Sequence, residues 1–386
     1  MRGLDVVVVG GAGHVGAPLA VVLASRGLQT LVYDRNEQAV ECILGGGLPF
    51  LDEGADDLLR SALTSGHLDA TWHPEGISHA RYVVLTIGTP VDEFHNPELG
   101  AVRECVDGIL PYLCSGQTIV LRSTVFPGVT EWLARYLSSR LPVAVAFCPE
   151  RVVQGRAVEE LQTLPQIVSG TTQLAEDAAA ELFERIAPRV IRMRPREAEY
   201  AKLVCNAYRY LQFAATNQFC AMVESDGCSY ARVLAGLRDG YPRADIPLPG
   251  FAAGPCLHKD TLQLIASGDF DLGHAAIRAN EGMAAFVVDR LRHLCDLPDS
   301  VVGILGAAFK PDSDDPRSSL SYKLRKLLEF HAKRVLMTDP HVTDSSLLPF
   351  GEVVERSDVL VLAVRHRAYE GVDLSGKPVF DFHAER

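Results

Sequence analysis

Three features are scarce in this sequence, and each scarcity argues against a class of protein. No apolar run approaches the roughly 18 residues that a membrane-spanning helix needs. Positive charge is in deficit, with 37 Lys and Arg against 49 Asp and Glu, which gives a formal net charge of −12. A general nucleic-acid-binding protein needs a basic face, so we expect no nucleic-acid partner, although local Arg and Lys can still bind phosphate groups.

Regular spacing is missing from the nine cysteines, none of which forms a CxxC pair. A scattered, odd-numbered set is typical of free thiols, and without ligand-type Cys/His spacing we expect no zinc or other metal. The opening residues lead directly into the apolar run that starts at Leu4, without the longer apolar segment and cleavage site of a signal peptide. We therefore expect a cytoplasmic protein.

What the sequence does contain is an alternation of short β-branched runs with helical stretches. With 386 residues, the chain is too long for one typical core. Strands are predicted at Leu4–Val9, Thr30–Tyr33, Tyr82–Thr86, Thr118–Leu121 and Val143–Phe147, and again at Val301–Leu305, Arg334–Thr338, Val359–Val364 and Val379–Phe382. Helices are predicted at Ala17–Ser25, Glu197–Glu224, Thr261–Leu294 and Ser319–His331. Alternation of this kind implies parallel sheets covered by helices.

The predicted fold is therefore α/β with three parts. An N-terminal Rossmann-type doubly wound sheet is expected at residues 1–190, a helical middle layer at 191–298 and a smaller Rossmann-like α/β domain at 299–386. Long apolar helices in the middle of such a chain often carry a subunit interface, so a homodimer or a larger homo-oligomer is expected through them.

A dinucleotide site is predicted after the first strand, where Gly11-Ala12-Gly13-His14-Val15-Gly16 fits GxGxxG. The motif follows a strand and opens a helix, and Asp34 stands at the end of the second strand. Its glycines permit a tight turn, an approach of the backbone to a diphosphate and close helix packing. Asp34 would accept a hydrogen bond from a ribose 2′-hydroxyl, which favours NAD over NADP, although the neighbouring Arg35 could meet a phosphate.

Three further segments carry groups suited to acyl chemistry. Cys256 follows a Gly/Pro-rich stretch at the start of a predicted helix, where the helix N-terminus and Lys259 would favour a thiolate. Asp260 lies one turn further on the same face. On the preceding helix, Lys202 and Asn206 are four residues apart and share a face. Taken singly, Cys256 could be a structural thiol and Lys202 a surface residue.

The third segment, Cys148-Pro149-Glu150-Arg151, lies just past a strand's carboxyl end, where open α/β sheets bind ligands. Glu150 there could position a water or hydroxyl group, or it could be an ordinary solvated loop acid.

Together these segments make the chain resemble the UDP-glucose/GDP-mannose dehydrogenase family over essentially its full length. The matching stretches are Gly11–Gly16, Thr89-Pro90-Val91-Asp92-Glu93, Ser123–Thr130, Pro149-Glu150-Arg151, Glu199–Asn206, Gly254–Asp260, Phe309-Lys310-Pro311-Asp312 and Asp315–Ser319.

The resemblance implies an NAD-dependent, four-electron oxidation of the primary alcohol at carbon 6 of a nucleotide-sugar. Cys256 would capture the aldehyde as a thiohemiacetal and hold the acyl group as a thioester until water releases the acid. The implied catalytic residues are Cys256, Lys202, Asn206, Asp260, Glu150 and Thr124. Those implied at the cofactor are Gly11, Gly13, His14, Val15, Gly16, Asp34, Arg35, Thr89, Pro90, Ser123, Thr124 and Arg317. Those implied at the substrate are Glu150, Arg151, Lys202, Asn206, Arg243, Pro249, Gly250, Phe251, Phe309 and Lys310.

The sugar is less well specified than the reaction. Cys256 to Asp260 resembles the branch that oxidises UDP-glucose, and UDP-glucose to UDP-glucuronate is the main interpretation. Where that branch has a second glutamate, this chain has Gln154, as in the branch that acts on UDP-N-acetylhexosamines. UDP-N-acetylmannosamine, UDP-N-acetylglucosamine and GDP-mannose are therefore alternatives. A one-step hydroxyacid dehydrogenase and a non-catalytic nucleotide-sugar binder remain as more distant hypotheses.

Overall fold

The computed structural model describes residues 3–92, 98–374 and 376–383. They form two compact units, one built from residues 1–205 with 262–267 and the other from 206–261 with 268–386. Among the described residues, no helix combines the length and the apolar character that crossing a membrane requires.

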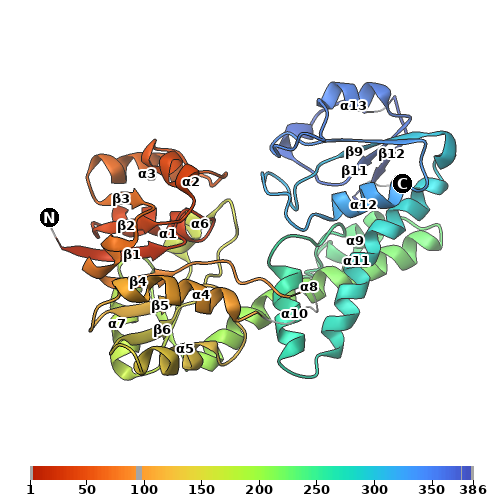
Figure 1. Cartoon of the computed structure of the whole chain (residues 1–386). Coiled ribbons are helices and arrows are strands. Elements are labelled where there is room, and N and C mark those ends of the chain that lie inside the picture. Colours follow the sequence, from red (N-terminus) through yellow and green to blue (C-terminus); the bar gives the residue numbers. More distant parts are fainter. Residues whose placement is uncertain (1–2, 93–97, 375, 384–386) are drawn as a thin grey trace. The chain divides into compact units, whose positions relative to one another are not determined.

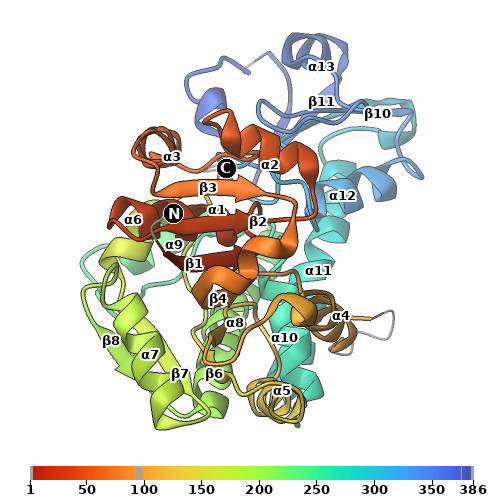
Figure 2. The ribbon, with the colours of Figure 1, turned by 60° about the vertical axis from the view of Figure 1, so that its left-hand side comes forward.

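The first unit is built on an eight-stranded sheet (Figure 1). In spatial order its strands are β3 (Leu68–Thr71), β2 (Thr30–Tyr33), β1 (Leu4–Val9), β4 (Ala80–Leu85), β5 (Thr118–Leu121), β6 (Ala144–Phe147), β7 (Gln166–Gly170) and β8 (Val190–Arg192). Figure 2 shows β3, β2, β1 and β4 in this order. The order 3-2-1-4-5-6 is that of a doubly wound dinucleotide-binding sheet, so the predicted N-terminal fold is confirmed.

Helices cover both faces of this sheet because its strands are apolar on both sides. Along β1, Val6 and Val8 pack into one core, with α1, α2, α3, α6 and α7, and Val7 and Val9 pack into the other, with α4 and α5. The helices are α1 (Gly16–Ser25), α2 (Glu37–Leu44), α3 (Ala55–Thr64), α4 (Gly100–Ile109), α5 (Val129–Ser138), α6 (Ala157–Thr163) and α7 (Gln173–Phe183).

One part of the sheet departs from the prediction. β3, β7 and β8 were not predicted, and β7 runs antiparallel to β6 with Phe147 paired to Ser169. These strands are three to five residues long and lack a clear apolar period, so the sequence carries little local signal for them.

Long helices dominate the middle of the chain, as expected. They are α8 (Pro195–Ser225), α9 (Tyr230–Arg238), α10 (Leu257–Ala266) and α11 (Asp271–Arg292). The prediction of a single helix from Thr261 to Leu294 is wrong, because α10 ends at Ala266 and α11 begins at Asp271. The break contains Gly268, and glycine is a poor helix former.

The C-terminal part of the second unit is a four-stranded, all-parallel sheet, so the predicted smaller Rossmann-like domain is also confirmed. In spatial order its strands are β10 (Arg334–Thr338), β9 (Val301–Leu305), β11 (Val359–Leu362) and β12 (Val379–Asp381), and its helices are α12 (Leu320–Leu328) and α13 (Phe350–Arg356). α12 ends at Leu328, three residues before the predicted end at His331.

A buried carboxylate on α8 caps a helix of the first unit. Glu199 is fully buried and accepts hydrogen bonds from the amides of Gly128 and Thr130, at 2.6 and 2.8 Å, and from the Thr130 hydroxyl at 2.6 Å. These amides lie at the N-terminus of α5, where the helix provides no acceptor. Burial raises the pKa of Glu199, and the three donors oppose this shift.

We predict that Glu199→Ala lowers the stability of the first unit, because it leaves three buried donors without an acceptor. The expected loss is about 3 kcal/mol, which corresponds to a fall of roughly 6–12 °C in Tm for a unit of this size. Differential scanning calorimetry measures the change. Glu184→Ala is the matched control, because Glu184 is exposed at the end of α7. We expect it to shift Tm by at most about 2 °C. Equal Tm values for the two variants would contradict the capping role.

Candidate functional site

The loop between β1 and α1 has the shape of a dinucleotide cradle. A Cβ at Gly11 would lie 2.5 Å from the Val8 carbonyl oxygen, and one at Gly16 would lie 2.6 Å from the Gly11 Cα. At Gly13 a Cβ would meet only the Gly10 carbonyl oxygen, at 3.7 Å. The first and third glycines are therefore required by packing, and the second leaves the backbone open to a ligand.

Asp34 follows β2 and supports this loop. Its Oδ2 accepts from the Ala12 amide at 3.1 Å and its Oδ1 from the Asn36 amide at 3.0 Å. The side chain is half-buried, so it retains acceptor capacity for a ribose hydroxyl. Arg35 is exposed. The glycine loop and Asp34 thus fit an NAD molecule, whose nicotinamide accepts a hydride when it is bound.

His14 stands inside the glycine loop and contacts two side chains of the first unit. Its ring lies 4.1 Å from the Phe50 ring, measured between centroids, and its Nδ1 lies 3.2 Å from the Gln154 amide nitrogen. Gln154 occupies the position where the UDP-glucose branch has its second glutamate. In this chain that position is therefore linked to the cofactor loop.

The carboxyl ends of β4 and β5 carry the remaining predicted cofactor residues of the first unit. The Thr89 hydroxyl donates to the Thr124 carbonyl at 2.5 Å, and the Ser123 hydroxyl donates to the Ile87 carbonyl at 2.7 Å. These bonds join the two loops where an open sheet binds ligands. Pro90 is exposed beside Thr89.

Glu150, just after β6, is buried rather than solvated. Its Oε2 accepts hydrogen bonds from Nε of Arg122, at 3.0 Å, and from Nη2 of Arg122. Its Oε1 accepts hydrogen bonds from the amides of Arg151 and Val152, at 2.7 and 3.0 Å. Arg122 is 1% exposed and lies over the Phe183 ring. Glu150 is therefore a firmly held group. The Arg151 guanidinium donates to the Pro165 carbonyl.

Lys202 and Asn206 lie one turn apart on α8. Lys202 is only 8% exposed, although a lone lysine on a helix is usually solvated. Asn206 is also buried, and its Nδ2 donates to Oδ2 of Asp260 at 2.5 Å.

Cys256 immediately precedes α10, as predicted. Its carbonyl accepts the first hydrogen bond of the helix from the Asp260 amide at 2.8 Å, so the exposed thiol stands at the positive end of the helix dipole. All nine cysteines are free thiols, and burial raises the pKa of Cys148 to about 12 and that of Cys105 to about 11. Cys256 differs from those two in being exposed at a helix start.

Two charged pairs surround this helix start within the second unit. Lys259 Nζ lies 3.0 Å from Oδ1 of the fully buried Asp260, so the positive charge expected beside the thiol is shared with that carboxylate. Arg317 forms a bidentate pair with Asp315. That hydrogen bond raises the pKa of Arg317.

The segment before Cys256 is tied into the second unit. Asn217, buried on α8, exchanges two hydrogen bonds with the backbone of Gly250, at 2.8 and 2.9 Å. The Pro249 carbonyl lies 2.9 Å from Nε2 of His383, and Phe251 packs edge-on against Phe382.

Two predicted substrate residues of the second unit lie after β9. Phe309 abuts Gly254, where a Cβ would lie 2.4 Å from its ring, and Lys310 Nζ lies 6.0 Å from the Phe309 ring centroid. Arg243 is exposed and lies against Tyr241.

The predicted residues thus meet in separate groups. The first unit holds Gly11, Gly13, His14, Val15, Gly16, Asp34, Thr89, Ser123, Thr124, Glu150 and Lys202, and the second holds Asn206, Cys256, Asp260, Phe309, Lys310 and Arg317. Sequence reasoning missed the groups that hold them: Arg122, Asn217, Asp315 and the acid Asp339, which follows β10. Of these, Asp339 had a sequence signal because it follows a strand as Asp34 does, and Asp315 stood in one of the matching stretches.

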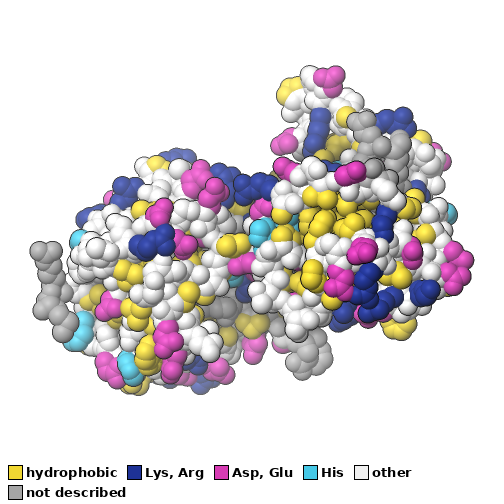
Figure 3. All heavy atoms as spheres, turned by 90° about the horizontal axis from the view of Figure 1, so that it is seen from above, with side chains coloured by type: hydrophobic (Ala, Val, Ile, Leu, Met, Phe, Trp, Pro, Cys, Tyr) yellow, Lys and Arg dark blue, Asp and Glu magenta, His cyan; other side chains and the backbone are white. Residues whose placement is uncertain are grey.

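Charge on the surface is mixed. On the face drawn in Figure 3, acidic and basic side chains are interspersed.

Comparison with known proteins matches all three parts of the chain to one family. The NAD binding domain of the UDP-glucose/GDP-mannose dehydrogenase family matches residues 5–187, the central domain 196–281 and the UDP binding domain 303–384.

Individual relatives agree with this match. The UDP-N-acetyl-D-mannosamine dehydrogenase of Pyrococcus horikoshii is 28% identical over 380 residues, covering 94% of this chain and 90% of the relative. The NDP-N-acetyl-D-galactosaminuronic acid dehydrogenase of Ralstonia nicotianae is 29% identical over 389 residues, covering 94% and 91%. A structure of a UDP-glucose dehydrogenase from Pyrobaculum islandicum superposes with a TM-score of 0.88 at 26% identity, covering 98% and 94%. The chain belongs to the UDP-glucose/GDP-mannose dehydrogenase family and is an NAD-dependent nucleotide-sugar dehydrogenase.

Proposed function

We propose that this protein oxidises the carbon-6 primary alcohol of a UDP-N-acetylhexosamine to the carboxylate, with two molecules of NAD. The choice of sugar rests on the names of two relatives, because the enzymes of P. horikoshii and R. nicotianae are both named for N-acetylated sugars. Gln154 agrees, since a glutamate is expected there in the UDP-glucose branch. This choice replaces UDP-glucose, our main interpretation from the sequence, by its alternative.

UDP-glucose remains the second candidate. It is favoured by the run from Cys256 to Asp260 and by the similarity to the P. islandicum enzyme.

Cys256 is the proposed nucleophile. After carbon 6 loses a first hydride and its hydroxyl group loses a proton, the thiolate adds to the aldehyde carbon and the oxygen takes a proton, which gives a thiohemiacetal. Loss of a second hydride and of the hydroxyl proton leaves a thioester. Water then attacks the acyl carbon, the C–S bond breaks, and the acid and the free thiol are released. The helix start at Cys256 favours the thiolate both as nucleophile and as leaving group.

Polar groups, most of them buried, serve this chemistry in the proposal. Lys202 stabilises the negative charge that develops on the substrate oxygen, and the Asn206 amide assists it. Asp260, which Asn206 and Lys259 hold in place, holds or activates the water together with Thr124. Glu150 orients the sugar and the catalytic water as a fixed charge, because its two oxygens already receive four hydrogen bonds.

The proposed substrate contacts are Glu150, Arg151, Lys202, Asn206, Arg243, Pro249, Gly250, Phe251, Phe309 and Lys310. Remaining proposed cofactor contacts are His14, Val15, Arg35, Thr89, Pro90, Ser123, Thr124 and Arg317. The domain boundaries at residues 190 and 298 also stay predictions.

The proposed oligomer is a homodimer through α8. Tyr208, Phe219 and Met222 are 60%, 49% and 63% exposed, and together with Ala215 they follow one another at intervals of seven, four and three residues. Such spacing gives one apolar stripe along a helix, which is a common feature of subunit interfaces.

We predict that the wild-type enzyme releases two NADH for each UDP-N-acetylhexosamine consumed, with a higher kcat/KM than on UDP-glucose or GDP-mannose. Cys256→Ser should form no uronate and should release at most one NADH, because a serine does not provide the thioester route. NADH absorbance with product analysis by mass spectrometry measures both. Cys205→Ser removes an exposed thiol on α8 and should keep the ratio of two. Acid formation by Cys256→Ser would remove the cysteine from the mechanism.

We predict that Lys202→Met lowers kcat by about 10²-fold or more, the size typical of losing an oxyanion stabiliser. Methionine keeps the volume of the buried side chain and removes the charge. Steady-state kinetics with saturating NAD measure the effect. Lys326→Met, on the exposed side of α12, is the control, and a kcat for Lys202→Met within about twofold of that control would refute the role.

We predict that Tyr208→Glu with Met222→Glu shifts the protein from dimer to monomer, because each change introduces a charge into the apolar stripe. Analytical ultracentrifugation across a concentration series measures the mass. Phe330→Glu changes an equally apolar side chain that is 85% exposed elsewhere, and it should leave the dimer intact. A wild type that sediments as a monomer would contradict the proposed interface.

A further inference from the structure

The C-terminal sheet repeats the device that supports the glycine-rich loop. Asp339, after β10, accepts from the amides of Ala307 and Ala308 at 2.6 and 2.9 Å, as Asp34 accepts from Ala12. The two acids differ in what else they hold. Asp34 is half-buried, whereas the Asp339 side chain is fully buried and faces Nε2 of His366 at 3.0 Å. In the C-terminal domain a histidine of the chain therefore takes the place beside this acid that a ribose hydroxyl can take beside Asp34.

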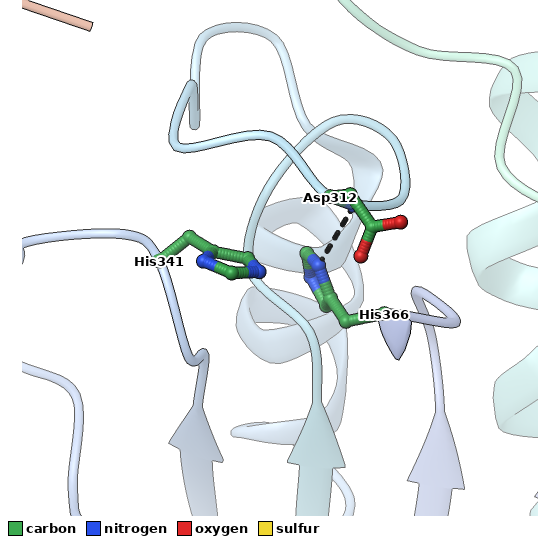
Figure 4. A group of neighbouring side chains, drawn as sticks. All are labelled: Asp312, His341 and His366. Atoms are coloured by element: carbon green, nitrogen blue, oxygen red, sulfur yellow. Dashed lines mark hydrogen bonds between the residues drawn. The ribbon is translucent and has the colours of Figure 1, made fainter. Parts of the chain in front are cut away.

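His366 uses both of its ring nitrogens to join three loops. Nδ1 accepts from the Asp312 amide at 3.0 Å, and Nε2 faces Asp339. Figure 4 shows the hydrogen bond between Asp312 and His366 above the carboxyl ends of the parallel strands. The tautomer that satisfies both contacts has its proton on Nε2, because an amide N–H requires an acceptor and a carboxylate requires a donor.

Asp312 is held in an unusual backbone conformation by this arrangement. Its φ of 53° lies in the left-handed region, which costs a non-glycine residue about 1 kcal/mol or more. The Asp312 amide donates to His366. The Asp312 carboxylate accepts hydrogen bonds from the amide and from Nε of Arg367, at 2.9 and 2.7 Å. The turn is therefore maintained by the loop after β11.

A metal site is the rival interpretation of the same cluster. One ligand atom from each of Asp312, His341 and His366 lies within 4.8 Å of the others. A metal would need a lone pair of His366, yet Nδ1 already accepts from an amide and Nε2 carries the proton that faces Asp339. The Asp312 carboxylate is engaged by Arg367. The cluster is thus a hydrogen-bonded clamp.

We propose that His366 is a positioning residue for nucleotide-sugar binding, which acts by clamping the loop from Phe309 to Asp312 onto Asp339. Lys310 and Phe309 lie two and three residues before Asp312, so the clamp fixes the position of the loop segment that carries them. The inference rests on the proposed function, because that function assigns Phe309 and Lys310 to the substrate. Asp339 supports it: burial alone would raise its pKa, but the His366 contact and the loop amides outweigh burial and hold that pKa well below the usual range.

The test separates the two bonds of His366 with matched variants of the full-length enzyme. In His366→Asn the side-chain oxygen can take the position of Nδ1, which preserves the bond from the Asp312 amide. In His366→Gln the side-chain nitrogen can take the position of Nε2, which preserves the bond to Asp339. His366→Leu removes both bonds. His341→Leu is the control, because the described contact of that ring with His366 is edge-on packing at 5.1 Å between centroids.

We expect the Gln and Leu variants to raise the KM for the nucleotide-sugar and the Kd of UDP by about tenfold, the effect of losing one well-formed hydrogen bond. Their kcat and their Kd for NAD should stay within about twofold of wild type. Hydrogen exchange at the Asp312 amide should be faster in both variants and close to wild type in His366→Asn and His341→Leu.

Unchanged exchange at Asp312 in His366→Leu would overturn the clamp. Faster exchange with unchanged KM and UDP affinity would overturn the positioning role, and so would an equal loss of NAD and UDP affinity. An effect of His341→Leu as large as that of His366→Leu would favour the metal site instead. If the wild type oxidises no UDP-N-acetylhexosamine, the proposed function fails, while amide exchange and UDP affinity still decide the clamp.

Discussion

In the loops that follow the parallel strands, several main-chain amides donate their hydrogen bonds to side-chain carboxylates. Asp34 holds the loop after β1, Glu150 holds the loop after β6, and Asp339 holds the loop after β9. A buried amide without an acceptor costs about 1–3 kcal/mol, so each loop is stable only with its acid in place. Since open sheets bind ligands at these loops, the same acids determine the shape of the ligand-binding edge.

The carboxylates differ in how much acceptor capacity they retain, and this difference separates binding from support. Asp34 is partly exposed and holds two amides, which leaves room for a ribose. Glu150 is saturated by Arg122 and two amides, and Asp339 by four amides and a histidine. A saturated carboxylate acts on a ligand only through its fixed charge and through the loop that it holds.

The thiols are separated by environment in a similar way. Cys148 and Cys105 are covered by apolar side chains, which raises their pKa and removes the thiolate that chemistry requires. Cys256 is exposed at the start of α10, followed by an acid that is itself paired to Lys259 and Asn206. The helix start thus presents an exposed thiol.

Much of the fold was predictable because its signals are local. The strands β1, β2, β5, β9 and β10 were predicted with their observed ends, since each is an apolar, β-branched run between turn residues. The antiparallel β7 and the short β8 were not, because their pairing depends on strands that lie elsewhere in the chain. The break between α10 and α11 was missed although Gly268 marks it, because the apolar helical pattern continues on both sides.

For the site, the sequence by itself determined which residues are predicted to carry chemistry: the glycine loop and Asp34, the thiol at a helix start, and a lysine and an amide one turn apart. Only the tertiary structure decided how they are held. Hydrogen bonds join Glu150 to Arg122, Glu199 to Thr130 and His366 to Asp312. The partners in these three pairs are separated by 28, 69 and 54 residues, respectively. No local pattern encodes such partners, because a hydrogen bond depends on where folding brings two atoms and not on the residues that flank either one.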